Sequence, residues 1–519
     1  MVNWLRDAVF YEIYPQSFQD SNGDGIGDFE GIIQRLDYIK ELGCNAIWMN
    51  PCFESPFFDA GYDVADYYKA APRYGTNEDL KRLFCEVHRR GMHILLDLVP
   101  GHTSIEHKWF QQSMKAEQNE YTGRYIWTDS VWKDFEGINN IRGCLRGVSD
   151  RDGSCAANFF STQPALNYGF AKPAEAWQSA PDSKDALATR QAMKEVMAFW
   201  LGLGCDGFRV DMAMSLVKGD DDGQETVKLW QDITGYLKEK FPNAAMISEW
   251  GEPQKSLRGG FHMDFMLQGG PCRYDDLFRC GEPYFSRRGK GDISAFVKAY
   301  RENAQKTRGK GLMCIMSGNH DVERLRDSLD EEEMKTAFAF IFSLPGAPFL
   351  YYGDEIGMRY LKGLKSVEGG YFRTGSRSPM QWDDGPNAGF SSASKDALYI
   401  TLDPDVDRPN VKAQIADEHS LYHTVKRLIS LRLEHEALQS CAKIEFLYAE
   451  KNAAPLVFKR RGEKETVLVA INPFGEEARC TIPVEKVKEV LYAYPAQAEF
   501  KDGVLTVPAG SATYFLLSE

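Results

Sequence analysis

The sequence has no pair of cysteines in a Cys-x-x-Cys spacing, and its 11 cysteines are scattered along the chain. A disulfide framework or a zinc module would show a regular spacing, so we expect reduced and mostly buried thiols. No apolar run reaches the roughly 18 residues of a membrane-spanning helix, and no basic start precedes an apolar stretch, as it would in a signal peptide. These absences predict a soluble, cytoplasmic protein.

An excess of positive charge is also missing. The chain carries 61 Lys and Arg against 75 Asp and Glu, which gives a net charge of −14. An acidic surface repels phosphate groups, so nucleic acid and anionic membranes are not expected as partners. Aromatic residues make up 13% of the chain, which fits either large aromatic cores or rings that stack on sugars. The composition leaves the oligomeric state open.

Short apolar runs alternate with segments of helical period along most of the chain. The runs are 8–14, 46–50, 93–99, 207–211, 245–250, 262–266, 312–317 and 348–352. The helical segments are 29–42, 77–90, 184–203, 224–240, 293–307 and 331–343. An open doubly wound sheet usually has a Gly-x-Gly-x-x-Gly turn after the first run, and none is present. The pattern predicts an α/β fold in which eight parallel strands close into a (β/α)₈ TIM barrel.

Two stretches interrupt or follow this alternation. More than a hundred residues separate the third run from the fourth, and a structureless loop of that length is improbable in a compact domain. We predict a small inserted domain at 103–170, with the catalytic barrel formed by 1–102 and 171–435. Residues 355–415 resemble a long loop, and a helix is expected at 419–433. Short strands with turns between them predict a C-terminal all-β sandwich at 436–519.

Carboxylates follow several of the predicted strands, at Asp211, Glu249 and Asp321. In a barrel of this type the active residues gather at the carboxyl ends of the strands. A single Asp at such a position often caps the next helix, but three at one rim indicate a reaction centre. Paired carboxylates are typical of glycoside hydrolysis, in which one attacks or stabilises the sugar and the other donates a proton.

Basic side chains accompany these carboxylates. Arg209 lies two residues before Asp211, so both side chains face the same way on a strand. Its charge is expected to hold Asp211 ionised. His102 and His320, at two other strand ends, could hydrogen-bond to sugar hydroxyls.

These strand ends, together with the segment Val-Phe-Tyr-Glu-Ile-Tyr-Pro-Gln-Ser-Phe at 9–18, resemble glycoside hydrolase family thirteen, the α-amylase family. Within it the chain is most similar to the α-glucosidase and oligo-1,6-glucosidase branch, over nearly its whole length. The resemblance implies a retaining enzyme with Asp211 as nucleophile, Glu249 as general acid/base and Asp321 as stabiliser of the distorted sugar. It also places Arg209, His102 and His320 at sugar subsites and makes Asp97 a structural aspartate.

A second match concerns the size of the substrate. Asp59 and Tyr62 resemble the family residues that grip the non-reducing end and stack on that glucose. In exo-acting members the Asp pairs with an Arg from the loop before a Pro-Met-Gln-Trp segment, here 379–382. Arg373 and Arg377 both stand there, and the sequence does not say which one pairs. Phe160 matches an aromatic residue of the same site.

A third match is a loop of alternating oxygen ligands and small residues at 20–28. It resembles an EF-hand loop but lacks its terminal Glu. In the α-glucosidase branch such a loop binds Ca²⁺ or Mg²⁺ in a structural role. The resemblance implies these ligands: Asp20, Asn22, Asp24, Asp28 and the carbonyl of Ile26. No organic cofactor is expected.

The chain departs from the family at Gly101, where the family usually has an Asn that binds calcium, and at Met212, directly after Asp211. Related glucosidases carry Val there with α-1,6 cleavage and Thr or Ala with α-1,4 cleavage, so the linkage stays open. We expect an exo-acting α-glucosidase on small oligosaccharides. The alternative is a transglucosidase or a sugar isomerase of the trehalose or sucrose type. A non-catalytic transporter subunit is disfavoured because all three carboxylates are present and no membrane span is expected. A pure sugar-binding module is disfavoured because binding alone does not require an acid, a nucleophile and a stabiliser together.

Overall fold

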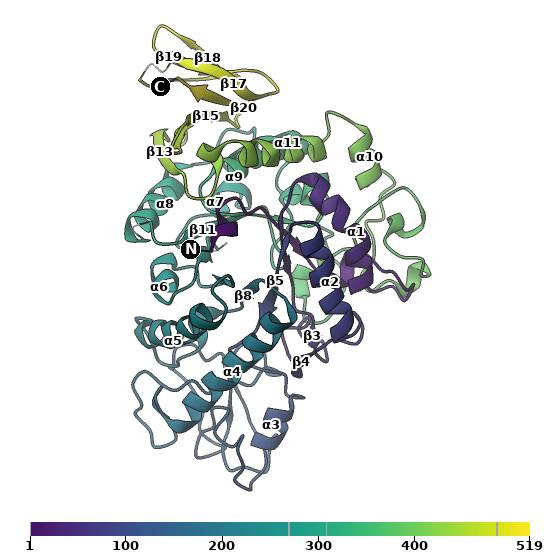
Figure 1. Ribbon diagram of the computed structural model, residues 1–519, viewed down its shortest axis with the longest axis vertical. Helices are drawn as coiled ribbons and strands as arrows, with labels where there is room; N and C mark the ends of the chain where they lie inside the picture. The colour runs from purple at the N-terminus through teal and green to yellow at the C-terminus, as the bar shows by residue number, and fades with distance from the viewer. Residues whose placement is uncertain (1, 268–269, 308, 484–485, 519) are drawn as a thin grey trace.

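A closed barrel of eight parallel strands lies at the centre of the protein (Figure 1). The computed structural model describes residues 2–267, 270–307, 309–483 and 486–518. The barrel strands are β1 (Phe10–Ile13), β2 (Ala46–Met49), β5 (His93–Leu98), β8 (Gly207–Val210), β9 (Ala245–Ser248), β10 (Met263–Phe265), β11 (Leu312–Met316) and β12 (Pro348–Tyr351). Around the barrel they follow the order β1-β12-β11-β10-β9-β8-β5-β2. The predicted TIM barrel is therefore confirmed.

Helices between the strands cover the outside of the barrel (Figure 1). They are α1 (Phe29–Leu42), α2 (Asn77–Arg89), α4 (Lys184–Leu203), α5 (Gln224–Lys240), α6 (Pro253–Arg258), α8 (Ser294–Thr307), α9 (Glu331–Ser343) and α11 (Leu421–Glu434). Local sequence sets their ends. Asp28 accepts the N–H of Gly31 at the start of α1, and Gly43 ends that helix with a φ of 107°. A side-chain cap and a left-handed glycine are common helix ends.

Shorter elements lie in the connections. They are the helices α3 (Lys108–Ser113), α7 (Asp275–Phe278) and α10 (Val411–Ala416), and the 3₁₀ helices η1 (Asn3–Arg6), η2 (Pro15–Ser17), η3 (Ala213–Ser215), η4 (Leu325–Asp327), η5 (Asp354–Ile356), η6 (Tyr371–Ser376), η7 (Pro386–Gly389), η8 (Lys395–Ala397) and η9 (Glu436–Leu438). In the described part of the chain, no helix has the length and apolar character needed to cross a membrane.

Aromatic side chains fill the interior of the barrel. Phe10 stacks on Phe349 with ring centroids 4.2 Å apart, and Trp48 and Phe265 lie 6.0 and 4.9 Å from Phe349. All four side chains are buried. Because the interior is packed, a pocket can open only above it, at the carboxyl ends of the strands.

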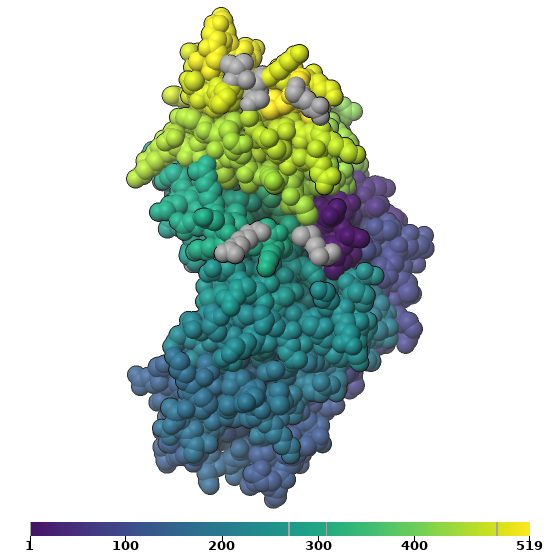
Figure 2. Space-filling model, turned by 60° about the vertical axis from the view of Figure 1, so that its left-hand side comes forward, coloured from purple at the N-terminus to yellow at the C-terminus, as the bar shows by residue number. Residues whose placement is uncertain are grey.

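The segment between β5 and α4 forms a layer at one end of the molecule, in blue in Figures 1 and 2. It contains α3 and the antiparallel hairpin of β6 (Gly143–Leu145) and β7 (Cys155–Ala157). A shorter hairpin, β3 (Phe53–Glu54) with β4 (Asp66–Ala70), follows β2. The layer has a small core of its own, and Trp177 packs against Phe170 in it, with ring centroids 5.5 Å apart. Its packing therefore continues past residue 170, where the sequence analysis ends the insertion.

Two antiparallel sheets form the opposite end, in yellow in Figures 1 and 2. One has the order β13-β14-β15-β20-β17 and the other β16-β19-β18. Their strands are β13 (Lys443–Tyr448), β14 (Leu456–Arg461), β15 (Thr466–Asn472), β16 (Ala478–Thr481), β17 (Val487–Tyr494), β18 (Glu499–Lys501), β19 (Val504–Val507) and β20 (Ser511–Leu517). One apolar core lies between the sheets. The other face of the larger sheet contacts α9, which is buried from Glu333 to Ser343.

The predicted barrel strands and long helices lie within two residues of their observed bounds. Several shorter elements were not predicted from the sequence, and one of them, α10, lies in the region read as a long loop. They are α3, α6, α7, α10, β3, β4, β6, β7 and β18. Each of these elements spans six residues or fewer, too few to show a periodic pattern.

Candidate active site

A pocket of about 100 Å³ opens at the carboxyl ends of the barrel strands. The side chains that line it are Asp59, Tyr62, His102, Phe159, Asp211, Met212, Glu249, Asp321 and Arg373. Seven of these nine belong to the site expected from the sequence, and Phe159 and Met212 are additional. The fold thus brings together residues that follow six different barrel strands: β2, β5, β8, β9, β11 and β12.

One buried guanidinium joins three carboxylates beneath the pocket. Arg209 on β8 lies 3.0 Å from an oxygen of Asp97, of Asp211 and of Glu249. The register of β5 and β8 sets Asp97 directly opposite Arg209. Glu249 also accepts a hydrogen bond of 3.0 Å from the backbone N–H of Met212. These charge-assisted contacts fix the orientation of both candidate reacting carboxylates.

The charge state of this cluster depends on opposing effects. Burial raises the pKa of Asp211 well above its ordinary value, the charge of Glu249 adds to that effect, and Arg209 opposes it. Burial likewise raises the pKa of Asp97 to about 6 against the influence of Arg209. Arg209 therefore opposes the rise in the pKa of Asp211 that burial and the charge of Glu249 cause. The sequence alone does not reveal these opposing effects.

A second arginine closes one side of the pocket. Arg373, in η6, donates to Oδ1 of Asp321 at 2.9 Å and to Oδ1 of Asp59 at 3.3 Å. Gln163 donates to the other oxygen of Asp59 at 2.8 Å. Arg377 contacts Asp321 at 3.1 Å, and no hydrogen bond or ion pair joins it to Asp59 among the described residues. The partner of Asp59, left open by the sequence, is Arg373 in the structure.

The arginines also set the charge of Asp321. Burial favours its neutral form, but the charges of His320, Arg373 and Arg377 hold the pKa of Asp321 below its usual range. Burial lowers the pKa of His320 to about 3, so at neutral pH the arginines supply this effect. Asp59 differs, since burial raises its pKa and Arg373 only opposes the rise.

Several polar side chains lie beneath the pocket and contact the residues that line it. The ring of Tyr62 stacks on His320 with centroids 5.3 Å apart, and its hydroxyl donates to Asp97 at 2.9 Å. Nδ1 of His320 lies 2.9 Å from Glu12 of β1, and burial raises the pKa of Glu12. Arg209, His320 and Arg377 are thus supporting residues and do not line the pocket. Glu12 was not predicted as a site residue because it lies inside an apolar strand.

Phe159 occupies the place expected for Phe160. Phe159 lines the pocket. The centroid of the Phe160 ring lies 4.6 Å from that of Phe159 and 6.0 Å from that of Tyr371. Phe159 therefore lines the pocket, and Phe160, the next residue, packs against its ring. His102 does line the pocket, as expected, and its Nε2 donates to the carbonyl oxygen of Tyr62 at 2.8 Å.

The loop at 20–28 folds around its own backbone. The carboxylate of Asp20 accepts the N–H groups of Asn22, Gly23 and Gly25. Asn22 accepts from Asp24, Asp24 accepts from Ile26, and Asp28 caps α1. Over the described residues, no three His, Cys, Asp or Glu side chains are grouped so that they could hold a metal ion. These side chains as placed do not form a metal site, and Ca²⁺ or Mg²⁺ here stays a prediction.

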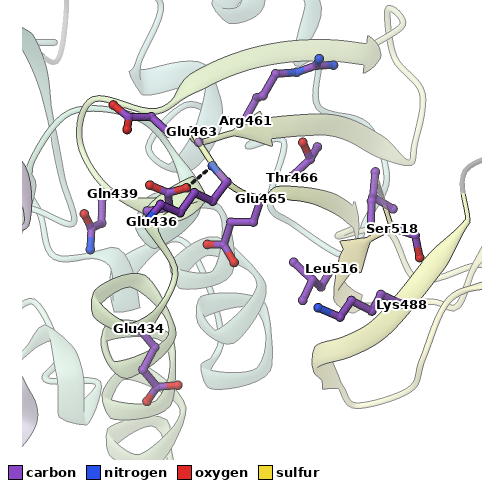
Figure 3. A pocket seen from close by; sticks show the side chains of 13 residues that line it. Glu434, Glu436, Gln439, Arg461, Glu463, Glu465, Thr466, Lys488, Leu516 and Ser518 are labelled. Carbon is purple, nitrogen blue, oxygen red and sulfur yellow. Dashed lines mark hydrogen bonds between the residues drawn. The ribbon is translucent and has the colours of Figure 1, made fainter.

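A larger hollow of about 850 Å³ lies beside the C-terminal sheets, away from the barrel mouth (Figure 3). Charged side chains such as Glu434, Arg461 and Lys488 line it, and its described lining includes no aromatic ring. Glu465 in its wall accepts the N–H of Ala437 at 3.1 Å. This hollow contains none of the residues expected from the sequence, and without rings it offers no stacking surface for a sugar.

Comparison with known proteins shows which family the chain resembles. The catalytic-domain model of the alpha-amylases matches residues 12–441. An oligo-1,6-glucosidase of Parageobacillus thermoglucosidasius is 31% identical over 84% of this chain and 84% of its own length. A trehalose synthase/amylase TreS of Mycolicibacterium smegmatis is also 31% identical, over 84% of this chain and 77% of its own.

Solved structures share the fold of this chain. The trehalulose synthase MutB of Pseudomonas mesoacidophila superposes with a TM-score of 0.83 at 25% identity, covering 99% of both chains. The matched catalytic domain spans the barrel and all the pocket residues, including the three carboxylates at the strand ends. The chain is therefore a glycoside hydrolase that belongs to the α-amylase family.

Proposed function

We propose that the protein is a retaining, exo-acting α-glucosidase that removes terminal α-linked glucose from short oligosaccharides. The observation that carries this proposal is the ion-paired wall in which Arg373 joins Asp59 to Asp321. It closes a pocket of about 100 Å³, which suits one sugar ring rather than the interior of a chain. The oligo-1,6-glucosidases among the relatives support the same activity.

In the proposed reaction Asp211 attacks the anomeric carbon while Glu249 protonates the departing glycosidic oxygen. The bond between glucose and the leaving sugar breaks as the bond to Asp211 forms. Glu249, now ionised, then takes a proton from water, whose oxygen displaces Asp211 from the sugar. Arg209 contacts both carboxylates and holds them in place through the two steps, and Asp321 binds sugar hydroxyls at the transition state.

A second candidate function is sugar isomerisation or transglucosylation. It would begin with the same glucosyl–Asp211 intermediate, which a sugar hydroxyl rather than water would then attack. The matches to a trehalose synthase and to trehalulose synthase structures favour it. Met212 lines the pocket directly beside Asp211 and Glu249, so its flexible thioether is placed to influence the second sugar.

An NMR time course with maltose, isomaltose, sucrose and trehalose, each offered separately, tests both candidates. Early release of α-glucose from one of them supports the α-glucosidase and names its linkage. New disaccharides that accumulate without matching free glucose support the isomerase or transglucosidase. Early release of β-glucose would contradict the retaining mechanism, and cleavage of internal bonds in longer glucans would contradict the exo-acting pocket.

A further inference from the structure

A buried lysine lies behind the pocket and takes no part in the proposed reaction. Lys218, in the loop after β8, has a fully buried side chain. Its ammonium donates to the carbonyl of Ser215 at 2.6 Å, to the carbonyl of Asn140 at 3.0 Å and to Oδ1 of Asn158 at 2.7 Å. An ammonium has three N–H donors and no acceptor, so these three oxygens use all of them. Burial lowers the pKa of Lys218 to about 7.

This ammonium fixes which way the side chain of Asn158 points. Because Lys218 can only donate, the amide oxygen of Asn158 must face it, and the NH₂ group must face the other way. That NH₂ group lies 3.1 Å from Nδ1 of His102, which lines the pocket. The backbone of Asn158 is held as well, since its N–H donates to Gln163 at 3.0 Å.

The orientation of the amide determines the tautomer of His102. An NH₂ group donates, so Nδ1 must accept and carry no hydrogen. Nε2 then carries the hydrogen, which agrees with its bond of 2.8 Å to the carbonyl oxygen of Tyr62. Burial lowers the pKa of His102 to about 4, and the charge of Lys218 also contributes to the lowering. His102 is therefore a neutral N–H donor at neutral pH.

Gly101 leaves room for this arrangement. A Cβ at position 101 would lie 2.9 Å from the amide nitrogen of Asn158 and 3.2 Å from Oγ of Ser215. Real Cβ atoms do not approach so closely without displacing a neighbour. The residue that precedes His102 must therefore be small if the amide of Asn158 is to reach the ring.

We propose that Lys218 and Asn158 are positioning residues that hold His102 in its neutral Nε2–H tautomer, so that its one N–H binds the carbonyl oxygen of Tyr62, another residue of the pocket; we call Lys218, Asn158 and His102 the amide relay. The relay joins three segments distant in the sequence: the loop after β5, the inserted layer and the loop after β8. Its consequence for catalysis rests on the proposed function, because the pocket residues His102 and Tyr62 must meet a sugar. Its consequence for the tautomer of His102 does not rest on the proposed function.

The test replaces Asn158 by Asp, which keeps an oxygen for Lys218 but removes the NH₂ donor. Nδ1 of His102 then gains a hydrogen, which it donates to the new carboxylate. ¹⁵N NMR of the full chain labelled in its 9 histidines distinguishes the tautomers, and the signal absent from a His102→Gln variant identifies His102. We expect the signal to leave the Nε2–H pattern in Asn158→Asp, and kcat/KM to fall by about 10- to 100-fold.

Two further variants keep the test informative. Lys218→Met removes the ammonium and frees the amide to turn, so a mixture of tautomers is expected. Lys335→Met is the matched control, because Lys335 is also a buried lysine, with its ammonium bound to Glu332 and to the carbonyl of His419. It lies on α9, far from the pocket, and its loss is expected to lower stability while leaving the His102 signal unchanged.

The outcomes separate this inference from the proposed function. An unchanged His102 signal in Asn158→Asp would overturn the relay, whatever the activity. If the His102 signal changes in Asn158→Asp but the parent protein releases no glucose, the relay is supported and the proposed function is contradicted. A changed signal with undiminished kcat/KM would overturn the catalytic part of the proposal.

Discussion

Removal of Arg209 tests how the carboxylates of the pocket are kept reactive. The guanidinium lies 3.0 Å from oxygens of Asp97, Asp211 and Glu249 and is 2% exposed. Arg209→Met keeps most of the volume of the side chain and removes its charge. The variant leaves three carboxylates close together without a cation, in a site where burial already raises the pKa of Asp211 and of Asp97.

The size of the effect follows from the contacts. Two unit charges about 4 Å apart interact by about 4 kcal/mol at an effective dielectric constant of about 20, which corresponds to roughly 3 pKa units. We therefore expect the pKa of Asp211 to rise further. In the pH profile of kcat/KM, the acidic limb should move to higher pH by about 2–3 pH units. We also expect the free energy of unfolding at neutral pH to fall by about 3–5 kcal/mol, as when one partner of a buried ion pair is removed.

The loss of stability should itself depend on pH. Well below pH 4 the carboxyls are protonated in the folded and the unfolded state, so the missing charge matters least. As pH rises, the unfolded parent and the unfolded variant release these protons alike, but the folded variant retains them to a higher pH than the folded parent does. The destabilisation caused by Arg209→Met therefore grows as pH rises from the pKa values of the folded parent to those of the folded variant.

The assay combines pH–rate profiles on an aryl α-glucoside with urea unfolding at several pH values. Arg432→Met is the matched control, because Arg432 is also fully buried, and its hydrogen bonds go to the carbonyls of Phe342, Leu344 and Gly346 and to Oγ of Ser440. It should lose stability without a shift of the acidic limb. An unshifted limb in an active, folded Arg209→Met would refute the role assigned to the guanidinium.

Five other substitutions have definite expected results. Asp211→Asn and Glu249→Gln should each lower kcat by several orders of magnitude with little change in unfolding free energy, and normal turnover in either would remove it from the mechanism. Arg373→Ala should raise KM for disaccharides by about 10- to 100-fold, from the loss of charge-assisted contacts worth about 1.5–3 kcal/mol, and an unchanged KM would contradict the ion-paired wall. Burial raises the pKa of Asp264 to about 7, so between about pH 4 and 7 the folded state keeps a proton that the unfolded state loses. Stability then falls as pH rises by up to about 1.4 kcal/mol per unit, and Asp264→Asn should remove that slope in urea titrations. Ca²⁺ should raise the Tm of the parent but not of Asp24→Ala if the loop at 20–28 binds metal, and equal shifts would place the ion elsewhere.

The barrel was predictable because long periodic elements carry their signal locally. The bounds of α4 agree with the prediction because Ser183 caps its start and Gly204 follows its end. The strand β18 was not predictable, because its three residues form a strand only by pairing with β19. The catalytic carboxylates were predictable because they follow recognisable strands.

Other parts of the site depend on the path of the loops. Arg373 and Arg377 stand four residues apart, and only the course of η6 decides which one reaches Asp59. Phe159 and Phe160 are neighbours in the sequence whose rings pack together, and only the folded loop decides which of them lines the pocket. Lys218 carries no sequence signal at all, because a lone lysine in a loop is usually exposed.

The burial of α9 has a consequence for how the enzyme can be dissected. The barrel presses on one side of this helix and the larger C-terminal sheet on the other, and its residues from Glu333 to Ser343 are shielded from water. A chain shortened before β13 would lack Phe458, whose ring lies 6.4 Å from that of Phe340 on this helix, and would uncover the helix where it contacts β15 and β20. Proteolytic trimming before β13 should therefore yield aggregates rather than a minimal catalytic barrel.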